Sequence, residues 1–185
     1  AGLISGESPL VVMASKGLES GTSMLMHRVV AEVIPQSRIG ALSGPNLAVE
    51  IVRGIPTAAF CAFADPQDAE RVRGAFMCRT FRVYVSDDII GVELAGSLKN
   101  VLAIAAGLSD GLGFGDNTKG ALLARGLHEM ASLGLAMGAR IDTFLGVAGV
   151  GDLFATAAST LSRNYRVGRA LGSGSTLSQA QQQVG

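Results

Sequence analysis

Cysteine, histidine and tryptophan are almost absent from the sequence. It holds no tryptophan, two cysteines (Cys61 and Cys78) and two histidines (His27 and His128) in 185 residues. A structural zinc site takes four ligands, usually Cys and His, so this small set predicts no metal centre. Each cysteine lies in an apolar segment, which predicts two buried free thiols and a reducing compartment, the cytoplasm.

An excess of charge of either sign is also missing. Fifteen Lys and Arg residues balance 15 Asp and Glu residues, and charged residues make up only 16% of the chain. Without a basic run, nucleic acid is not expected as a partner. No uninterrupted apolar run approaches the roughly 20 residues that span a bilayer. The start of the chain lacks the pattern of a signal peptide, so we expect neither a secreted nor a membrane-spanning protein.

Glycine, by contrast, is abundant. The chain has 25 glycines, and 48% of its residues are hydrophobic. This apolar content excludes a disordered chain, and the absence of a three-residue glycine period excludes collagen. Excess glycine in an apolar chain indicates tight turns and close approach of the backbone to a ligand. The composition therefore predicts a globular protein that handles a small molecule.

The first half of the chain alternates short apolar runs with helix-length segments. The runs are bounded by Ser, Gly and Pro, which favours buried strands at 9–14, 39–42, 57–63 and 81–85. The helix-length segments between them are 20–33, 46–53 and 66–77. This alternation predicts an α/β layer with a mainly parallel sheet.

The strand signals end before Asp87, where the character of the chain changes. Asp87 and Asp88 can cap a helix, and helical periodicity then continues to about Leu108. Further helices are predicted at 118–137, 142–158, 163–172 and 176–184. We therefore divide the chain into an α/β part, residues 1–86, and an all-α part, residues 87–185.

The first predicted strand is not followed by a glycine-rich turn. A complete dinucleotide-binding domain begins with a strand and a Gly-x-Gly-x-x-Gly turn. Because the sequence lacks this turn, we expect the α/β part to be the later part of an incomplete Rossmann-type domain. The chain is then expected to be a piece of a longer protein.

Lys99 is the most informative single residue. On its predicted helix it lies away from the polar arc and among apolar and small residues such as Val92, Ala95 and Leu102. Two interpretations stay open. Lys99 either extends its ammonium group to the surface or faces a cleft, where desolvation would lower its pKa and suit it to proton transfer.

Two predicted strands end in segments that can bind a ligand. Lys16 directly follows the first strand, at the edge where ligands collect in open α/β sheets, although an ordinary surface lysine is the alternative. Ser43–Asn46 follows the next strand and opens a helix. This turn either presents backbone N–H groups to an anion or is simply a tight turn.

The all-α part offers a second set of polar residues. Ser162, Arg163 and Asn164 begin a predicted helix, where free N–H groups and a guanidinium can hold a phosphate; a plain helix cap with a solvated arginine is the alternative. Asp152 follows a glycine turn. It is either another helix cap or an acceptor for a substrate hydroxyl.

Several separated strings resemble one family, and they occur in matching order over about residues 8–175. The strings are Ser15–Glu19, Ser43–Pro45, Phe81–Tyr84, Ile90–Leu94, Leu98–Val101, Ser109–Gly115, Thr143–Gly146, Gly151–Leu153 and Ser162–Asn164. On these residues the chain resembles bacterial NAD(P)-dependent glycerol-3-phosphate dehydrogenase. Leu98-Lys99-Asn100 and Ser162-Arg163-Asn164 are its most specific strings.

The resemblance implies a role for each matching residue. It implies that Lys99 is the catalytic lysine, which exchanges a proton with the carbonyl oxygen and also contacts the substrate. Substrate contacts are implied for Lys16, Gly44, Asn46, Asp152, Thr156, Ser162, Arg163 and Asn164. Contacts with the nicotinamide cofactor, NAD or NADP, are implied for Lys16, Ala48 and Arg163. No metal is implied.

The resemblance also implies a fold and an activity. The fold is an incomplete Rossmann-type domain followed by an all-α substrate domain of the 6-phosphogluconate-dehydrogenase C-terminal type. The activity is reversible reduction of dihydroxyacetone phosphate to sn-glycerol 3-phosphate, which supplies glycerophospholipid synthesis. A homodimer stays open. So do two rivals: a dehydrogenase of 3-hydroxy acids, and a non-catalytic helical interaction module.

Two departures from the family pattern bear on the site. Asn46 stands where the family usually has Ser or Thr, so a hydroxyl contact becomes an amide contact or is lost. The chain also ends at Gly185, before family positions that help to bind the adenosine end of the cofactor. The preference between NADH and NADPH therefore cannot be read from this sequence.

Overall fold

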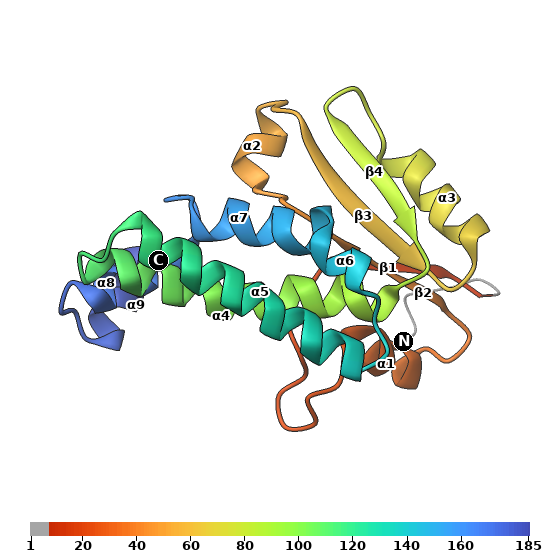
Figure 1. The fold of residues 1–185 in the computed structure, drawn as a ribbon. Coiled ribbons are helices and arrows are strands. Elements are labelled where there is room, and N and C mark those ends of the chain that lie inside the picture. The colour runs from red at the N-terminus through yellow and green to blue at the C-terminus, as the bar shows by residue number, and fades with distance from the viewer. Residues whose placement is uncertain (1–7) are drawn as a thin grey trace.

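The computed structural model describes residues 8–185, which form a four-stranded sheet joined to a set of helices (Figure 1). The strands are β1 (Leu10–Met13), β2 (Arg38–Ser43), β3 (Thr57–Phe63) and β4 (Phe81–Ser86). Three helices lie between them in sequence: α1 (Met26–Val33), α2 (Ala48–Val52) and α3 (Pro66–Phe76). The predicted succession of strands and helices in this half is confirmed.

The sheet is mixed, which the sequence did not predict in full. Its order is β1-β2-β3-β4, with β1–β2 and β3–β4 parallel but β2–β3 antiparallel. The cause is α2, which has only five residues and stands beyond the end of the sheet (Figure 1). Because α2 does not carry the chain back along a face of the sheet, β3 enters from the end at which β2 left.

The two faces of the sheet are covered by different helices. Side chains alternate along a strand, so Cys61 and Phe63 of β3 pack with Val72 of α3, while Phe60 and Ala62 pack with Val92 of α4. α4 (Ile89–Gly111) is the helix predicted after Asp88, whose carboxylate accepts a hydrogen bond from the Gly91 N–H at 2.8 Å. Both faces of the inner strand β3 are therefore apolar and packed.

The remainder is helical, as predicted. The elements are α5 (Asp116–Ala136), α6 (Ile141–Leu145), a π-helical turn η1 (Val147–Gly151), α7 (Asp152–Ala157), α8 (Arg163–Gly172) and α9 (Leu177–Val184). The single helix expected at 142–158 is thus three elements, because the glycines of the Val147–Gly151 segment favour a change of helical pitch. Asp152 directly follows this π turn.

Two further expectations from the sequence were wrong in detail. The helix expected from residue 20 begins only at Met26, because Gly21 and Ser23 have φ of 95° and 59° and form a turn. Cys61 is fully buried, and burial raises its pKa to about 11. Cys78, however, is exposed, because it lies in the turn between α3 and β4. In that turn the Cys78 N–H donates to the Phe81 carbonyl at 3.0 Å.

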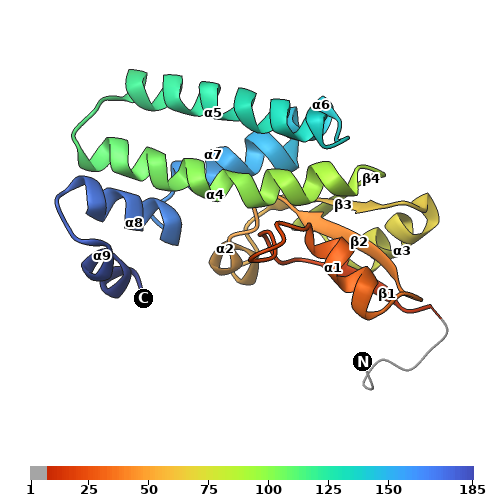
Figure 2. The same cartoon turned by 90° about the horizontal axis from the view of Figure 1, so that it is seen from below.

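Helix α4 connects the two parts of the molecule. It begins against β2 and β3 and continues between α5, α7 and α8 (Figures 1 and 2). By length and mean hydropathy (1.6) it could cross a membrane, but half of that apolar window is buried inside the protein. α4 also carries buried Glu93 and Lys99, so it is the central core helix of this fold.

Glycines let α8 lie directly against α4. A Cβ at Gly107 would lie 2.0 Å from the Tyr165 carbonyl oxygen, and one at Gly168 would lie 2.0 Å from the Ile104 carbonyl oxygen. Gly111 and Gly172 continue this contact one turn further along each helix. Backbone therefore packs on backbone, which fixes the start of α8 relative to α4.

Gly168→Ala is expected to destabilise the protein. The added methyl group meets backbone that cannot move aside, and overpacking of this kind costs about 1–3 kcal/mol. At about 2–4 °C per kcal/mol for a protein of this size, calorimetry should show a clear loss of Tm. Gly120→Ala on α5 is the control, because nothing lies within 4 Å of its Cβ and alanine favours the helix. A Tm of Gly168→Ala equal to that of Gly120→Ala would contradict this account.

Candidate active site

Lys99 is buried and does not extend to the surface. Lys99 is only 6% exposed. Its Nζ donates hydrogen bonds to Asp152 Oδ1 and, at 2.7 Å, to Thr156 Oγ1. Thr156 in turn donates to the Asp152 carbonyl at 2.7 Å. The face of α4 that carries Lys99 therefore lies toward α7, and the ammonium group of Lys99 contacts two polar side chains there, those of Asp152 and Thr156.

Asp152 is the counter-ion of two lysines. Its Oδ1 accepts from Lys99, and its Oδ2 accepts from Lys16 Nζ at 2.5 Å. The carboxylate is only 1% exposed and caps no helix. The sequence suggested a helix cap or an acceptor for a substrate hydroxyl, and neither interpretation included an ion pair with two lysines. Its chemical effect is to hold two cations side by side in a buried site, where each would be costly alone.

Two glycines allow Lys16 to reach this cluster. Gly44 has φ 155°, and a Cβ there would lie 2.8 Å from the Ala58 carbonyl oxygen. Only glycine fits that turn, which places the Gly44 carbonyl 3.0 Å from Lys16 Nζ. Gly96 on α4 leaves room for the aliphatic part of Lys16, 3.4 Å from where a Cβ would stand.

The segment that carries Lys16 is also fastened to α4. Glu93 accepts a hydrogen bond from the His27 backbone N–H at 3.0 Å, and its other oxygen lies 2.5 Å from His27 Nδ1. Because α1 has no side-chain cap of its own, this carboxylate from α4 takes that place. The segment from Lys16 to α1 is therefore held at both ends, at Lys16 by Asp152 and Gly44 and at His27 by Glu93.

The pKa of Lys99 is lowered to about 8. Burial of the ammonium group is the largest cause, and the positive charge of Lys16 acts in the same direction. The carboxylate of Asp152 opposes both by stabilising the charged form. A lysine with this pKa can donate and accept a proton near neutral pH, which an ordinary lysine does poorly.

A cleft opens directly beside Lys99. It has a volume of about 570 Å³ and is bounded by the start of α2, by α4 and by the start of α8. Seven of the residues predicted for the site line it: Asn46, Ala48, Lys99, Thr156, Ser162, Arg163 and Asn164. Lys16, Gly44 and Asp152 lie behind Lys99, so the structure brings all ten predicted residues to one place.

The start of α8 presents an anion-binding geometry to this cleft. Ser162 is the N-cap, and its hydroxyl accepts from the Tyr165 N–H at 3.2 Å. The exposed Arg163 is the first helical residue, followed by half-buried Asn164. Ser162 is therefore a helix cap as one interpretation held. The backbone N–H groups of Arg163 and Asn164, at the first two positions of α8, and the Arg163 side chain belong to residues that line this end of the cleft, where they can bind an anion.

Asn46 lines the cleft with an unused acceptor. Its Oδ1 is buried and has no hydrogen-bond partner among residues 8–185. A buried acceptor without a donor is unfavourable, so a ligand hydroxyl or amide in the cleft would satisfy it. The amide that replaces the family's hydroxyl thus keeps a polar atom in the site.

The sequence did not single out every residue of the cleft wall. Asn100, Thr160 and Arg166 also line it. Arg166 had a usable signal, because it lies three positions after Arg163 on a predicted helix and so shares its face. Thr160 had none, since it lies in the connection between α7 and α8.

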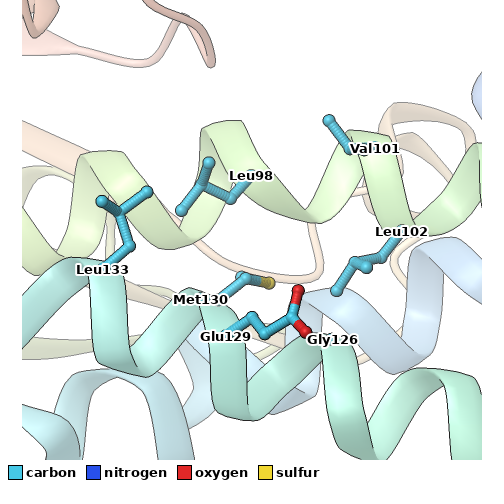
Figure 3. Close-up of a pocket in the computed structure, with 7 residues that line it drawn as sticks. All are labelled: Leu98, Val101, Leu102, Gly126, Glu129, Met130 and Leu133. Carbon is cyan, nitrogen blue, oxygen red and sulfur yellow. The ribbon is translucent and has the colours of Figure 1, made fainter.

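A second hollow, between α4 and α5, is of a different kind. It measures about 200 Å³ and is lined by Leu98, Val101, Leu102, Gly126, Glu129, Met130 and Leu133 (Figure 3). Glu129 is its only charged residue, and none of the predicted site residues lines it. Within residues 8–185, no group of three or more His, Cys, Asp or Glu side chains gathers to hold a metal ion. The predicted site residues therefore gather at the cleft beside Lys99 and not at this hollow.

Comparison with known proteins identifies similar families and chains. Residues 2–69 match the model of the NAD-dependent glycerol-3-phosphate dehydrogenase N-terminus, and residues 88–185 match that of its C-terminus. The chain is 49% identical to a glycerol-3-phosphate dehydrogenase of Thermoanaerobacter sp. (strain X514) over 95% of its length, which is 53% of that protein. It is 51% identical to one from Acidithiobacillus ferrooxidans over 91% of its length, 49% of that protein. The chain thus spans about half the length of the curated relatives it matches.

Solved structures show the same similarity. The crystal structure of glycerol-3-phosphate dehydrogenase from Coxiella burnetii matches with a TM-score of 0.95 and 43% identity, over the whole of this chain and 56% of that one. The yeast enzyme matches with a TM-score of 0.84 and 29% identity, over 93% of this chain and 52% of that one. The fold is therefore a Rossmann-type α/β part followed by an all-α part, as the sequence predicted.

Proposed function

Because the chain belongs to the NAD-dependent glycerol-3-phosphate dehydrogenase family, we propose that the protein reduces dihydroxyacetone phosphate to sn-glycerol 3-phosphate, reversibly, with NADH or NADPH. The observation that carries this proposal is the buried Lys99, with its lowered pKa, at the wall of a cleft whose other end is the start of α8. A proton donor and a phosphate-binding helix start are what this substrate requires at its two ends.

The residues of this chain fit a nicotinamide cofactor. The cleft is partly apolar beside Leu47, Ala48 and Val49, and the unused Asn46 oxygen offers a polar contact. Lys16, Ala48 and Arg163 would hold the cofactor, together with parts of the family's domain that this chain does not span. When bound, the nicotinamide supplies the hydride, which the protein's own side chains cannot do.

Each polar group then has a distinct task. Lys99 holds a proton on Nζ and donates it to the carbonyl oxygen as negative charge develops there. Asp152 and Thr156 orient that ammonium group, and Lys16 adds positive charge beside it. Arg163, Asn164 and the first N–H groups of α8 bind the phosphate, which fixes the carbonyl relative to Lys99.

The proposal extends to setting and assembly. We propose the cytoplasm as the compartment and phospholipid synthesis as the use of the product; the two free thiols support the first. A homodimer is also proposed. No feature of the site favours either of the two rival functions. A helical interaction module needs no buried ammonium group, and a 3-hydroxy acid dehydrogenase needs no phosphate-binding helix start.

Steady-state kinetics over a range of pH tests the proposal. We expect oxidation of NADH or NADPH that depends on dihydroxyacetone phosphate, with kcat/KM constant at low pH and falling as pH rises through about 8, the pKa of Lys99. The protonated lysine is the donor, so its loss at higher pH removes activity. In the reverse direction the unprotonated lysine is required, and the rate should rise through the same pH.

Asp152→Asn serves as the comparison for the pH profile. It removes the charge that raises the pKa of Lys99, so the fall in reduction should begin at a lower pH. Absence of any turnover by the wild-type protein, as full-length chain, would overturn the proposed function. Turnover with no pH dependence between about 7 and 9 would overturn only the role of Lys99.

A further inference from the structure

Arg166 is the one residue of the cleft wall whose charge the proposed mechanism does not use. It lies on α8, three positions after Arg163, and therefore on the same face of the helix. Both side chains line the cleft, together with Leu47 and Val49 at the start of α2. The cleft thus has two guanidinium groups along one wall.

The Arg166 guanidinium is poorly satisfied within the protein. Its Nε is buried and has no hydrogen-bond partner among residues 8–185. Its only recorded hydrogen bond there runs from Nη2 to the Val184 carbonyl, at a long 3.4 Å. No carboxylate within residues 8–185 lies within salt-bridge distance of it, whereas Arg38 and Arg140 each pair with an aspartate.

A half-buried guanidinium with an unpaired donor is an incomplete arrangement. Arginine carries five N–H donors in a planar fork, and a buried donor without an acceptor costs free energy that a ligand can return. The fork matches the oxygens of a phosphate, which it binds with two parallel hydrogen bonds. An acceptor supplied from the cleft would complete it.

We propose that Arg166 is a second phosphate-binding residue of this cleft, acting beside Arg163. The inference rests on the proposed function, since it takes the ligand of the cleft to carry phosphate. Phosphate would come from two sources, the substrate with its single group and the dinucleotide with its pyrophosphate. Arg166 binds one of them, and the two sources are separated by experiment.

The structure also offers a purely structural role for this side chain. The contact with Val184 links α8 to α9, and loss of that contact would lower stability without changing the cleft. Kinetic and binding measurements must therefore be paired with a measure of stability. Arg169 provides a matched control, because it lies on the same helix, is exposed and does not line the cleft.

The test uses the full-length protein with Arg166→Met, Arg166→Lys and Arg169→Met. For Arg166→Met we expect a rise of about 10- to 100-fold in one dissociation or Michaelis constant, the loss typical of a hydrogen-bonded charge pair. Fluorescence titration with NADH measures cofactor binding without turnover. The KM for dihydroxyacetone phosphate measures the substrate. Arg166→Lys should recover only part of the loss, because it keeps the charge but not the fork.

The outcomes separate the alternatives. Weaker NADH binding with an unchanged substrate KM assigns Arg166 to a cofactor phosphate, and the reverse result assigns it to the substrate phosphate; either supports the proposal. A lower Tm with both constants unchanged, or equal effects of Arg166→Met and Arg169→Met, would overturn it. Because wild-type activity is measured in the same series, failure of the proposed function is recognised separately.

Discussion

Replacing Lys99 by methionine in the full-length protein is expected to lower kcat for dihydroxyacetone phosphate by about 10²–10⁴-fold, the usual contribution of a positioned acid or base. The methionine side chain keeps most of the volume of lysine but has no proton to donate. Asp152 keeps its ion pair with Lys16 at 2.5 Å, so the buried carboxylate is not left without a partner. The fold should therefore survive the change, and the loss should fall on the chemical step.

Two comparisons make this test specific. The dissociation constant of NADH, measured by fluorescence, should stay within about threefold, less than the loss of one hydrogen-bonded charge contact, because the proposed cofactor contacts are Lys16, Ala48 and Arg163. Lys99→Arg should not restore kcat, because a guanidinium does not release its proton near neutral pH. If Lys99→Met kept more than about a tenth of kcat, the proton-donor role would be wrong and Lys99 would be a structural partner of Asp152.

Arg163→Ala is expected to lower kcat/KM for dihydroxyacetone phosphate by about 10²–10⁴-fold. A charge-assisted hydrogen bond contributes about 1.5–3 kcal/mol, and a two-bond contact with phosphate about twice that, which converts to this range at 1.4 kcal/mol per tenfold. Arg163 stands at the first position of α8 and is exposed to the cleft. The phosphate also orients the carbonyl group, so kcat should fall together with affinity.

The unphosphorylated substrate shows whether the effect belongs to phosphate. With dihydroxyacetone and saturating NADH, the already low rate should change by no more than about twofold on Arg163→Ala, as for an ordinary exposed substitution. Saturation removes the effect of the contact that Arg163 is proposed to make with the cofactor. Arg163→Lys should be intermediate, since it keeps the charge without the planar fork. Equal losses on both substrates at saturating NADH would instead mean that Arg163 acts only through the cofactor or the fold, and the substrate phosphate would have to bind elsewhere.

Much of the fold follows from local patterns in the sequence. The four apolar runs became β1 to β4. The run of β3 has no polar alternation because its residues pack on both faces of the sheet. The cap at Asp88 and the long apolar helix after it were also predictable, since capping depends on neighbours in sequence. Lys16, Ser43–Asn46 and Ser162–Asn164 were candidates because they lie at strand ends and a helix start, where ligands usually bind. Ala48 and Thr156 were candidates only through the family resemblance.

Other features depended on contacts between distant residues. Nothing local to Lys99 distinguishes a lysine at the surface from a buried one, and only the position of α7 decides between them. Asp152 lies 53 positions after Lys99 and 136 after Lys16, so no periodicity connects the three. The antiparallel pairing of β2 with β3 likewise depends on where α2 stands relative to the sheet, which a helix of five residues does not reveal.

The sequence by itself determined the elements, the change from α/β to all-α near residue 87, and which polar residues interrupt apolar segments. These are properties of neighbouring residues, because backbone preference and side-chain periodicity act over a few positions. Only the tertiary structure decided that Lys99 and Lys16 share one carboxylate, that glycines bring α8 against α4, and that Arg166 has no carboxylate partner among residues 8–185. Burial and electrostatic pairing depend on distance in space, so they exist only once the chain has folded.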